Sequence, residues 1–300
     1  MSSSSAEQVK DAAEHAVVSE HQSFMQIVVR RFLRHRLAMV GSIIIALLVL
    51  VAVFAPYVAP YGYRDHHYDS VLHSPSLRFP LGTDNVGACI LSRIIYASRI
   101  SLSVGFLSMF IAMSLGTAVG ATAGFFGGRI DNVLMRVVDV ALCIPALFLL
   151  LMIVAIVSPS TTIVVVAIGV TNWMVPSRIV RGQVLSLKEQ DFVEAARATG
   201  AGTPLIIMRH ILPNAMGPLI VNSTLMVGQA IITESTLSFL GVGIQPPTPS
   251  LGNMLTAAQT YLWMAPWMAV FPGLMILVLV LAFNLMGDGL RDALDPKLKE

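Results

Sequence analysis

Charged residues are scarce in this chain of 300 residues. Only 12% of them are Asp, Glu, Lys or Arg, whereas 55% are hydrophobic, and the mean hydropathy is +0.76. A soluble domain carries roughly 25% charged residues, so the composition predicts an all-α integral membrane protein instead. The net charge is only +2 and no basic stripe runs along the chain, which argues against a nucleic-acid partner.

Cysteines and nucleotide-binding motifs are also rare or missing. The two cysteines fall in different predicted regions, Cys89 in an outer segment and Cys143 within a span, so we expect no disulfide between them. The sequence contains no Gly-x-x-x-x-Gly-Lys motif and no Gly-Lys dipeptide. We therefore expect no ATPase site and no catalytic residue in this chain.

Charge-free runs predict six transmembrane helices, because about 20 apolar residues suffice to cross a bilayer. The predicted spans are 37–59, 100–124, 140–157, 161–177, 215–233 and 267–287. The expected organisation is an N-terminal tail with a basic amphipathic segment (1–36), an extracytoplasmic segment (60–98), a core domain with five spans (99–290) and a C-terminal tail (291–300). Because the N-terminus is polar, we expect no cleavable signal peptide, and we expect the first span to be an uncleaved anchor.

Lys and Arg residues set the expected orientation. If both termini are inside, the inner segments hold fifteen of the 19 Lys and Arg residues and the outer segments hold four. Cytoplasmic segments are enriched in Lys and Arg. Both termini, and the polar segment between the fourth and fifth spans, are therefore predicted to be cytoplasmic.

Small residues recur every four positions in the second predicted span. They are Ala112, Gly116, Gly120 and Gly124. Such a stripe lets another helix approach closely, and we favour tight packing over a pathway lining.

Ionisable and proline residues mark the third and fourth spans. Arg136 and Asp139 lie one helical turn apart, and we expect them to pair with each other. Pro145 and Pro176 are expected to kink their helices, which buried neighbours can accommodate.

The polar segment 181–213 predicts two short helices. Phe192, Ala195, Ala196 and Thr199 follow helical spacing and give a narrow face of small residues, with Glu194 on another face. Glu194 is placed to pair with Arg197, and Gly200 permits the left-handed turn that ends a helix.

A second short helix is expected to begin at Thr203-Pro204. Leu205, Met208 and Leu212 then form an apolar stripe before Pro213. From spacing alone, an ordinary inner loop that rests on lipid headgroups fits this segment as well as a docking site does.

These residues nevertheless carry a resemblance to a known family. Glu194-Ala195-Ala196, Gly200 and the run from His210 to Pro213 resemble the EAA loop of ABC importer permeases, which docks on the ATPase subunits. From about residue 24 to 298 the chain is similar to the C-type permease subunit of dipeptide and oligopeptide ABC importers. The other matching segments are 81–84, 127–128 with Asp131, 135–136 with Asp139, 237–243, 245–249 and, most specific, 283–297.

The resemblance implies a type I ABC importer permease fold in a bacterial inner membrane. It implies a homologous second permease, two ATP-binding subunits that hold ATP and Mg, an extracytoplasmic peptide-binding protein and surrounding lipid, with no cofactor in this chain. The implied coupling residues are Glu194, Ala195, Ala196, Arg197, Gly200, Leu212 and Pro213. The implied pathway residues on the fifth span are Asn222, Met226, Gln229 and Glu234.

Several alternatives stay open at this stage. Glu234, an ionisable group inside a span, is as well suited to pairing with a partner subunit as to lining a pathway. Related permeases for glutathione or nickel share the same motifs. An intramembrane enzyme is disfavoured because no nucleophile and base stand at a recognised spacing, and the outer His66, His67, Asp69 and His73 lack a metal-ligand spacing. Gly87-Ala88-Cys89 departs from the family's Gly-Arg-Asp.

Overall fold

The computed structural model describes residues 24–157 and 160–294, and its regular elements in these ranges are all helical. The predicted all-α class is therefore confirmed. The main helices are α2 (Phe24–Arg34), α3 (Arg36–Val53), α4 (Ala55–Val58), α5 (Ile90–Phe126), α6 (Gly128–Leu142), α7 (Ala146–Ile156), α8 (Thr161–Thr171), α9 (Met174–Leu187), α10 (Asp191–Ala198), α11 (Thr203–Leu205), α12 (Leu212–Phe239), α13 (Leu251–Gln259) and α14 (Trp267–Leu294). A 3-10 turn, η1 (Tyr68–Ser70), and a π-helical turn, η2 (Ile206–Ile211), complete them.

Four helical stretches are long and apolar enough to cross a membrane by themselves. They are α3, α5, the stretch 203–239 that ends in α12, and α14. Two further pairs qualify only together, α6 with α7 at a bend of 82° and α8 with α9 at a bend of 43°. The structure thus holds four to six candidate spans. Four of the predicted runs overlap the long helices, and the other two, 140–157 and 161–177, overlap the bent pairs.

Both bends lie beside the predicted prolines. Pro145 is the residue before α7, where its ring fits the start of a helix. The break between α8 and α9 falls at Asn172 and Trp173, ahead of Pro176. Pro176 has no N–H to bond to the carbonyl of Asn172 four residues earlier, so the helical ladder is interrupted there.

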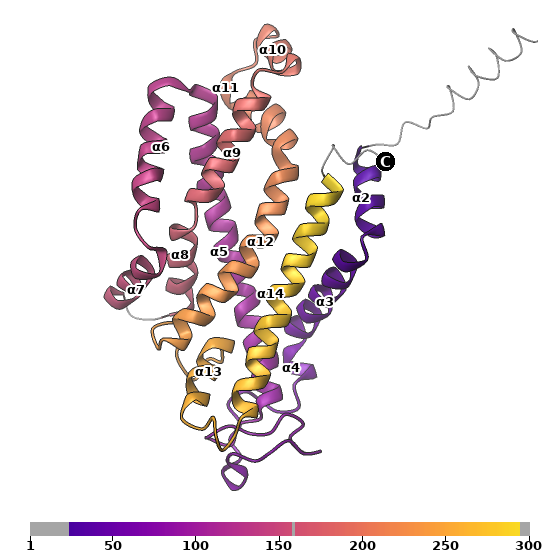
Figure 1. Ribbon diagram of the computed structural model, residues 1–300, viewed down its shortest axis with the longest axis vertical. Coiled ribbons are helices and arrows are strands. Elements are labelled where there is room, and N and C mark those ends of the chain that lie inside the picture. The colour runs from indigo at the N-terminus through magenta and orange to yellow at the C-terminus, as the bar shows by residue number, and fades with distance from the viewer. Residues whose placement is uncertain (1–23, 158–159, 295–300) are drawn as a thin grey trace, which may run out of the picture.

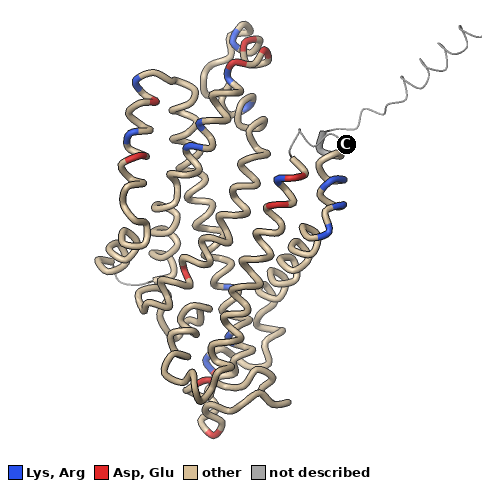
Figure 2. Tube along the Cα trace, in the orientation of Figure 1, with Lys and Arg blue, Asp and Glu red and all other residues tan. Residues whose placement is uncertain are grey.

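The helices form an elongated bundle with two distinct ends (Figure 1). The helices α5 and α12 run through the middle, with α3 and α14 on one side and α6 to α8 on the other. At one end lie α10, α11 and both ends of the described chain, and at the other lie α13 and the segment that follows α4. Figure 2 shows that charged residues gather mostly towards these two ends.

Close packing between α5 and α9 depends on the stripe of small residues. A Cβ atom added to Gly116 would lie 2.5 Å from Cβ of Pro176, and one on Gly120 would lie 2.3 Å from the carbonyl oxygen of Ser177. The four stripe residues are all buried. The predicted packing role is confirmed, because no larger side chain fits between the two backbones.

The predicted pairing of Arg136 with Asp139 is wrong. Arg178 on α9 donates from Nη2 to Oδ1 of Asp139 at 2.5 Å. One helical turn further along α9, Arg181 binds both carboxylate oxygens of Asp131 at 2.5 and 2.6 Å. The aspartates of α6 thus bind the arginines of the neighbouring helix, since a guanidinium from a facing helix can meet a carboxylate with paired N–H donors.

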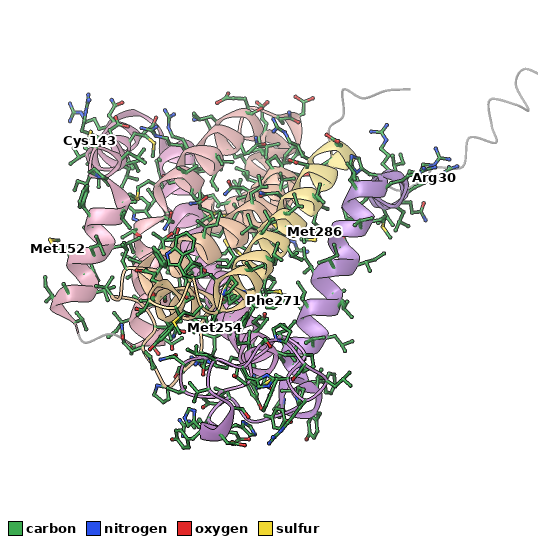
Figure 3. The ribbon with its side chains drawn as sticks, turned by 60° about the horizontal axis from the view of Figure 1, so that its bottom comes forward. Arg30, Cys143, Met152, Met254, Phe271 and Met286 are labelled. Carbon is green, nitrogen blue, oxygen red and sulfur yellow. The ribbon has the colours of Figure 1, made fainter. Side chains whose placement is uncertain are left out.

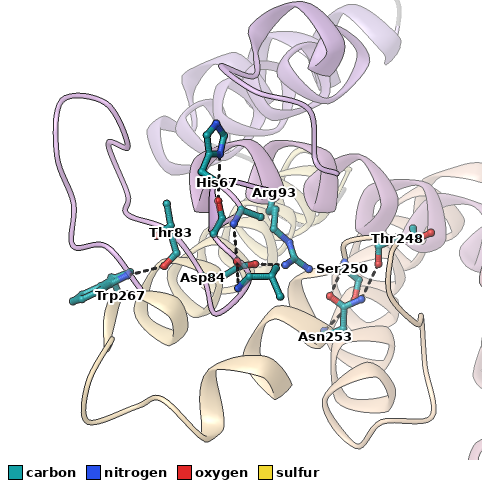
Figure 4. A network of polar contacts seen from close by, with 11 residues as sticks. His67, Thr83, Asp84, Arg93, Thr248, Ser250, Asn253 and Trp267 are labelled. Carbon is teal, nitrogen blue, oxygen red and sulfur yellow. Dashed lines mark hydrogen bonds and ion pairs between the residues drawn. The ribbon is translucent and has the colours of Figure 1, made fainter. Parts of the chain in front are cut away.

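The end of the molecule that holds α13 is closed by a polar network (Figure 4). Asp84 accepts backbone N–H groups of Val86 and Ala88 at 3.0 and 2.8 Å and forms an ion pair with Arg93. Nε1 of Trp267 donates to the carbonyl oxygen of Thr83 at 3.2 Å, which ties this loop to the start of α14. The segment between α4 and α5 is therefore a folded cap over this end of the bundle.

Residues 88 and 89, where the sequence departs from the family pattern, lie inside this cap. Ala88 and Cys89 are each 1% exposed. Cys89 is the N-cap residue of α5, and its side chain makes no capping hydrogen bond. An aspartate at this position would be a preferred cap, which gives the family's acidic residue a structural explanation.

A single helix, α2, stands at the edge of the bundle beside α14 (Figure 1). Val28 is buried, whereas Val29 and Leu33 are exposed together with Arg30 and Arg34. In Figure 3 the side chain of Arg30 points away from the other helices. The exposed side of α2 therefore carries both apolar and basic side chains.

Candidate functional site

Helix α10 projects from the end of the bundle and is held by a small apolar anchor (Figure 1). Val193 and Ala196 are 0% and 8% exposed and pack in one cluster with Val184, Ile206 and Ile211. Hydrophobic burial on this face fixes the position of the helix. Its opposite face, which carries Asp191, Glu194, Ala195, Ala198 and Thr199, is exposed.

The predicted pairing of Glu194 with Arg197 is not what the structure shows. The guanidinium of Arg197 lies over the ring of Phe125, 5.6 Å from its centre, which is a favourable cation–π arrangement. Glu194 has no ion pair with any residue in the described part of the chain. The small-residue face is also divided, because Ala196 is buried whereas Ala195 is exposed. The carboxylate of Glu194 is thus exposed on the surface beside Ala195.

Gly200 ends α10 in the predicted left-handed conformation, with φ of 82°. The N–H of Ala201 donates to the carbonyl of Ala196 at 3.1 Å, and the N–H of Gly200 donates to that of Arg197 at 2.9 Å. These two bonds define a Schellman motif, in which the left-handed position strongly favours glycine. The turn predicted from sequence is confirmed.

The chain then returns to the bundle through an irregular helix. Gly202, not Thr203, is the residue that precedes α11, so the expected threonine cap is wrong. The stretch Ile206–Ile211 is a π-helix in which Ile206 and Ile211 are buried and Met208 is 67% exposed. Leu212 is half-buried and Pro213 is exposed in the first turn of α12. Short π-helical turns are uncommon and occur frequently at functional sites.

Three adjoining hollows lie along α12. The first, about 690 Å³, lies between α5 and the stretch from α11 to α12 and is lined in part by Met113, Met208 and Leu212. The second, about 390 Å³, lies at the two helix bends. Met226 and Gln229 line this second hollow and also a third of about 20 Å³.

Three of the four predicted pathway residues share one face of α12. Asn222, Met226 and Gln229 follow each other at spacings of four and three residues. Nδ2 of Asn222 contacts Sδ of Met113 at 3.5 Å and Sδ of Met226 at 3.2 Å. Asn222 therefore lies between the first hollow and the other two.

Glu234 lies on a different face of α12 and lines none of these hollows. Five residues of helix separate it from Gln229, a rotation of about 140°. Its side chain is 0% exposed, and it accepts hydrogen bonds from Ser101 of α5 at 3.0 Å and Ser238 of α12 at 2.7 Å. Ser250, the cap of α13, also lies beside the carboxyl. Glu234 thus joins α5, α12 and α13 from within.

The sequence alone did not identify these serine partners. Ser101 and Ser250 lie outside the segments that carry the family resemblance, and Ser101 is 133 residues from Glu234 in the chain. The outer histidines likewise have ordinary partners, since His67 lies 3.3 Å from the carbonyl of Gly87 and His73 lies 2.8 Å from that of Ser74. Over residues 24–157 and 160–294, no three His, Cys, Asp or Glu side chains converge as a metal site would require.

Comparisons with known proteins agree with this geometry. Residues 116–300 match the family described as binding-protein-dependent transport system inner membrane component. Residues 23–75 match the N-terminal transmembrane domain of oligopeptide transport permease C. The two matches together include every main helix except most of α5.

Curated relatives and solved structures extend these matches. The chain is 43% identical over 266 residues to the dipeptide transport system permease protein of Alkalihalophilus pseudofirmus, covering 89% of this chain and 88% of that protein. It is 42% identical over 271 residues to the glutathione transport system permease protein of Escherichia coli, covering 90% and 89%. A methionine ABC transporter solved in inward-facing conformations has a chain of the same fold, with a TM-score of 0.54 at 18% identity, covering 68% of this chain and 96% of that one.

Proposed function

The chain belongs to the family of binding-protein-dependent transport system inner membrane components, and from that membership we propose that it is the permease subunit of an ATP-driven importer of dipeptides and oligopeptides. It forms the translocation pathway together with a homologous second permease. A peptide-binding protein delivers the substrate on the outer side. Two ATP-binding subunits, which hold ATP and Mg, supply the energy.

The observation that carries this proposal is the construction of α10. Val193 and Ala196 fix the helix to the bundle while Glu194 and Ala195 face solvent without partners in the described chain. A rigidly held helix with an exposed face of small and acidic side chains suits contact with another subunit. Movement of that subunit is then transmitted through Gly200, η2 and Leu212-Pro213 to α12.

The orientation and the location follow from the same proposal. We place both termini and α10 in the cytoplasm of a bacterium, with six spans across its inner membrane. The Lys and Arg distribution supports this orientation, and the described chain ends lie at the α10 end of the bundle (Figure 1). The cap over α13 then faces the binding protein.

Residues for the pathway are proposed from α12. Met226 and Gln229 line two of the hollows, Asn222 contacts the lining residues Met113 and Met226, and all three are proposed as pathway residues. Glu234 is proposed as a brace of the same pathway, since its carboxyl contacts only the neighbouring helices. The second candidate function is import of glutathione, which is favoured by the 42% identity to a glutathione permease.

Charge reversal on α10 tests the proposed coupling. Glu194→Lys and Gly200→Trp should reach the membrane in wild-type amounts but abolish peptide uptake, because the first alters the docking face and the second opposes the left-handed turn. Arg129→Glu, an exposed charge reversal at the same end of the bundle but outside α10, is the matched control. Wild-type uptake by both α10 variants would refute the assignment.

A further inference from the structure

Methionine side chains connect the three hollows along α12. Met113 and Met208 line the first hollow, and Met109 lines both the first and the smallest. Met226 lines the smallest and the hollow at the helix bends, where Met174 also lies. Shared lining residues make the hollows neighbours. We call these five methionines, together with Asn222 and Gln229, the methionine seam.

Amide groups along the seam are held weakly or not at all. Nδ2 of Asn222 has only the sulfur atoms of Met113 and Met226 as partners, and a thioether is a weak acceptor. The side chain of Gln229 is exposed and makes no hydrogen bond within the described residues. Both amides are therefore available to a stronger partner, such as the carbonyl or N–H of a peptide backbone.

Charge is absent from the walls of the seam. None of the residues that line the three hollows is Asp, Glu, Lys, Arg or His. The nearest ionisable residue along α12, Glu234, is turned away and enclosed by Ser101 and Ser238. A wall with a fixed charge would favour substrates of the opposite sign. This wall carries no charge and therefore does not select substrates by their net charge.

We propose that the methionine seam is the peptide-facing wall of the pathway, and that it passes peptides regardless of their net charge. The proposal rests on the proposed importer function and adds the substrate class to it. Flexible, polarisable thioethers adapt to side chains of different shape, while the amides of Asn222 and Gln229 bind the peptide backbone that all such substrates share. Selection among peptides then falls to other components, and glutathione, an anionic peptide, has no advantage here.

Introduced charges at Gln229 test this proposal. The wild-type complex, with its ATP-binding subunits and binding protein in proteoliposomes, should transport the tripeptides Ala-Ala-Ala, Ala-Lys-Ala and Ala-Glu-Ala at rates within about threefold when the binding protein is saturated. Gln229→Lys should lower the transport rate of Ala-Lys-Ala relative to that of Ala-Glu-Ala about tenfold. Gln229→Glu should change this ratio about tenfold in the opposite direction. This magnitude is expected for unit charges about 10 Å apart in a partly hydrated protein.

Two further variants complete the design. Val29→Lys places the same charge at an exposed position of α2, at the edge of the bundle and outside the three hollows, and should leave the ratio unchanged. Asn222→Asp changes charge without changing size, so it carries the test if the Gln229 variants fail to fold, and it should favour Ala-Lys-Ala. Two results would contradict the proposal that the seam faces the peptide. One is a preference above tenfold of the wild-type complex for either Ala-Lys-Ala or Ala-Glu-Ala. The other is the same ratio of the two transport rates in the wild type and in every folded seam variant. Transport of none of the three peptides by the wild-type complex would overturn the proposed function, and the seam with it.

Discussion

The contact between α5 and α9 makes a sharp prediction for Gly120→Ala. The added Cβ would lie 2.3 Å from the carbonyl oxygen of Ser177, 2.8 Å from Cβ of Val180 and 3.0 Å from the backbone nitrogen of Arg181. Ordinary van der Waals contact begins at 3.4 Å. Two of the three atoms belong to the backbone and cannot rotate away, so α9 must move by about 1 Å.

The expected magnitude combines two opposing effects. Overpacking costs about 1–3 kcal/mol, while alanine in place of glycine in a helix returns up to about 1 kcal/mol. We expect Gly120→Ala to be destabilised by about 1–2 kcal/mol. Gly182→Ala on α9 is the matched control, because a Cβ there meets nothing within 4 Å. This control should be stabilised by up to about 1 kcal/mol.

Both stability and transport report on this contact. Thermal unfolding of the purified complex should give a lower Tm for Gly120→Ala than for wild type, and a higher Tm for Gly182→Ala. Because α9 leads directly to α10, the displacement should also reduce ATP-dependent peptide uptake by the first variant. Equal Tm values for the two variants would refute the argument that the α5–α9 approach requires glycine.

Three further contacts give measurable outcomes. Asp131→Arg should lower stability by about 3 kcal/mol because it leaves the charge of Arg181 unpaired. Combining it with Arg181→Asp should restore most of the lost Tm. If the double variant shows no recovery, the ion pair does not contribute to stability. Glu234→Leu should reduce uptake and stability because it leaves buried hydroxyls without a hydrogen-bond partner. Glu234→Gln keeps hydrogen-bonding atoms and should retain more of both. If the two variants are indistinguishable, Glu234 does not join the helices through its hydrogen bonds. Cys89→Asp should stabilise α5 by about 1 kcal/mol as an N-cap, and an unchanged or lower Tm would contradict that explanation of the family's acidic residue.

Hydropathy and glycine placement predicted the elements that depend on local chemistry. Apolar runs long enough to span a bilayer coincide with the long helices, and the turn at Gly200 needs a positive φ that sequence alone indicates. The stripe from Ala112 to Gly124 was interpreted correctly as packing. Each of these signals is contained within one segment of the chain.

Features that depend on distant partners were missed or wrong. Asp139 was assigned to Arg136 because the two are neighbours in sequence, whereas the structure provides Arg178 from another helix. Glu234 was grouped with Gln229, although helical rotation alone would have separated their faces. Helix α13 is not among the helices predicted from the sequence, although its capping box between Ser250 and Asn253 is a local feature.

The central claim, that α10 contacts an ATP-binding subunit, is tested most directly by photo-crosslinking. A photo-crosslinking amino acid at exposed Ala195 should form an adduct with an ATP-binding subunit in the assembled complex, whereas one at Leu77, which is fully exposed in the cap at the other end of the bundle, should not. If the ATP-binding subunits co-purify but position 195 attaches only to lipid or to no protein, α10 is not the docking helix and the account is contradicted.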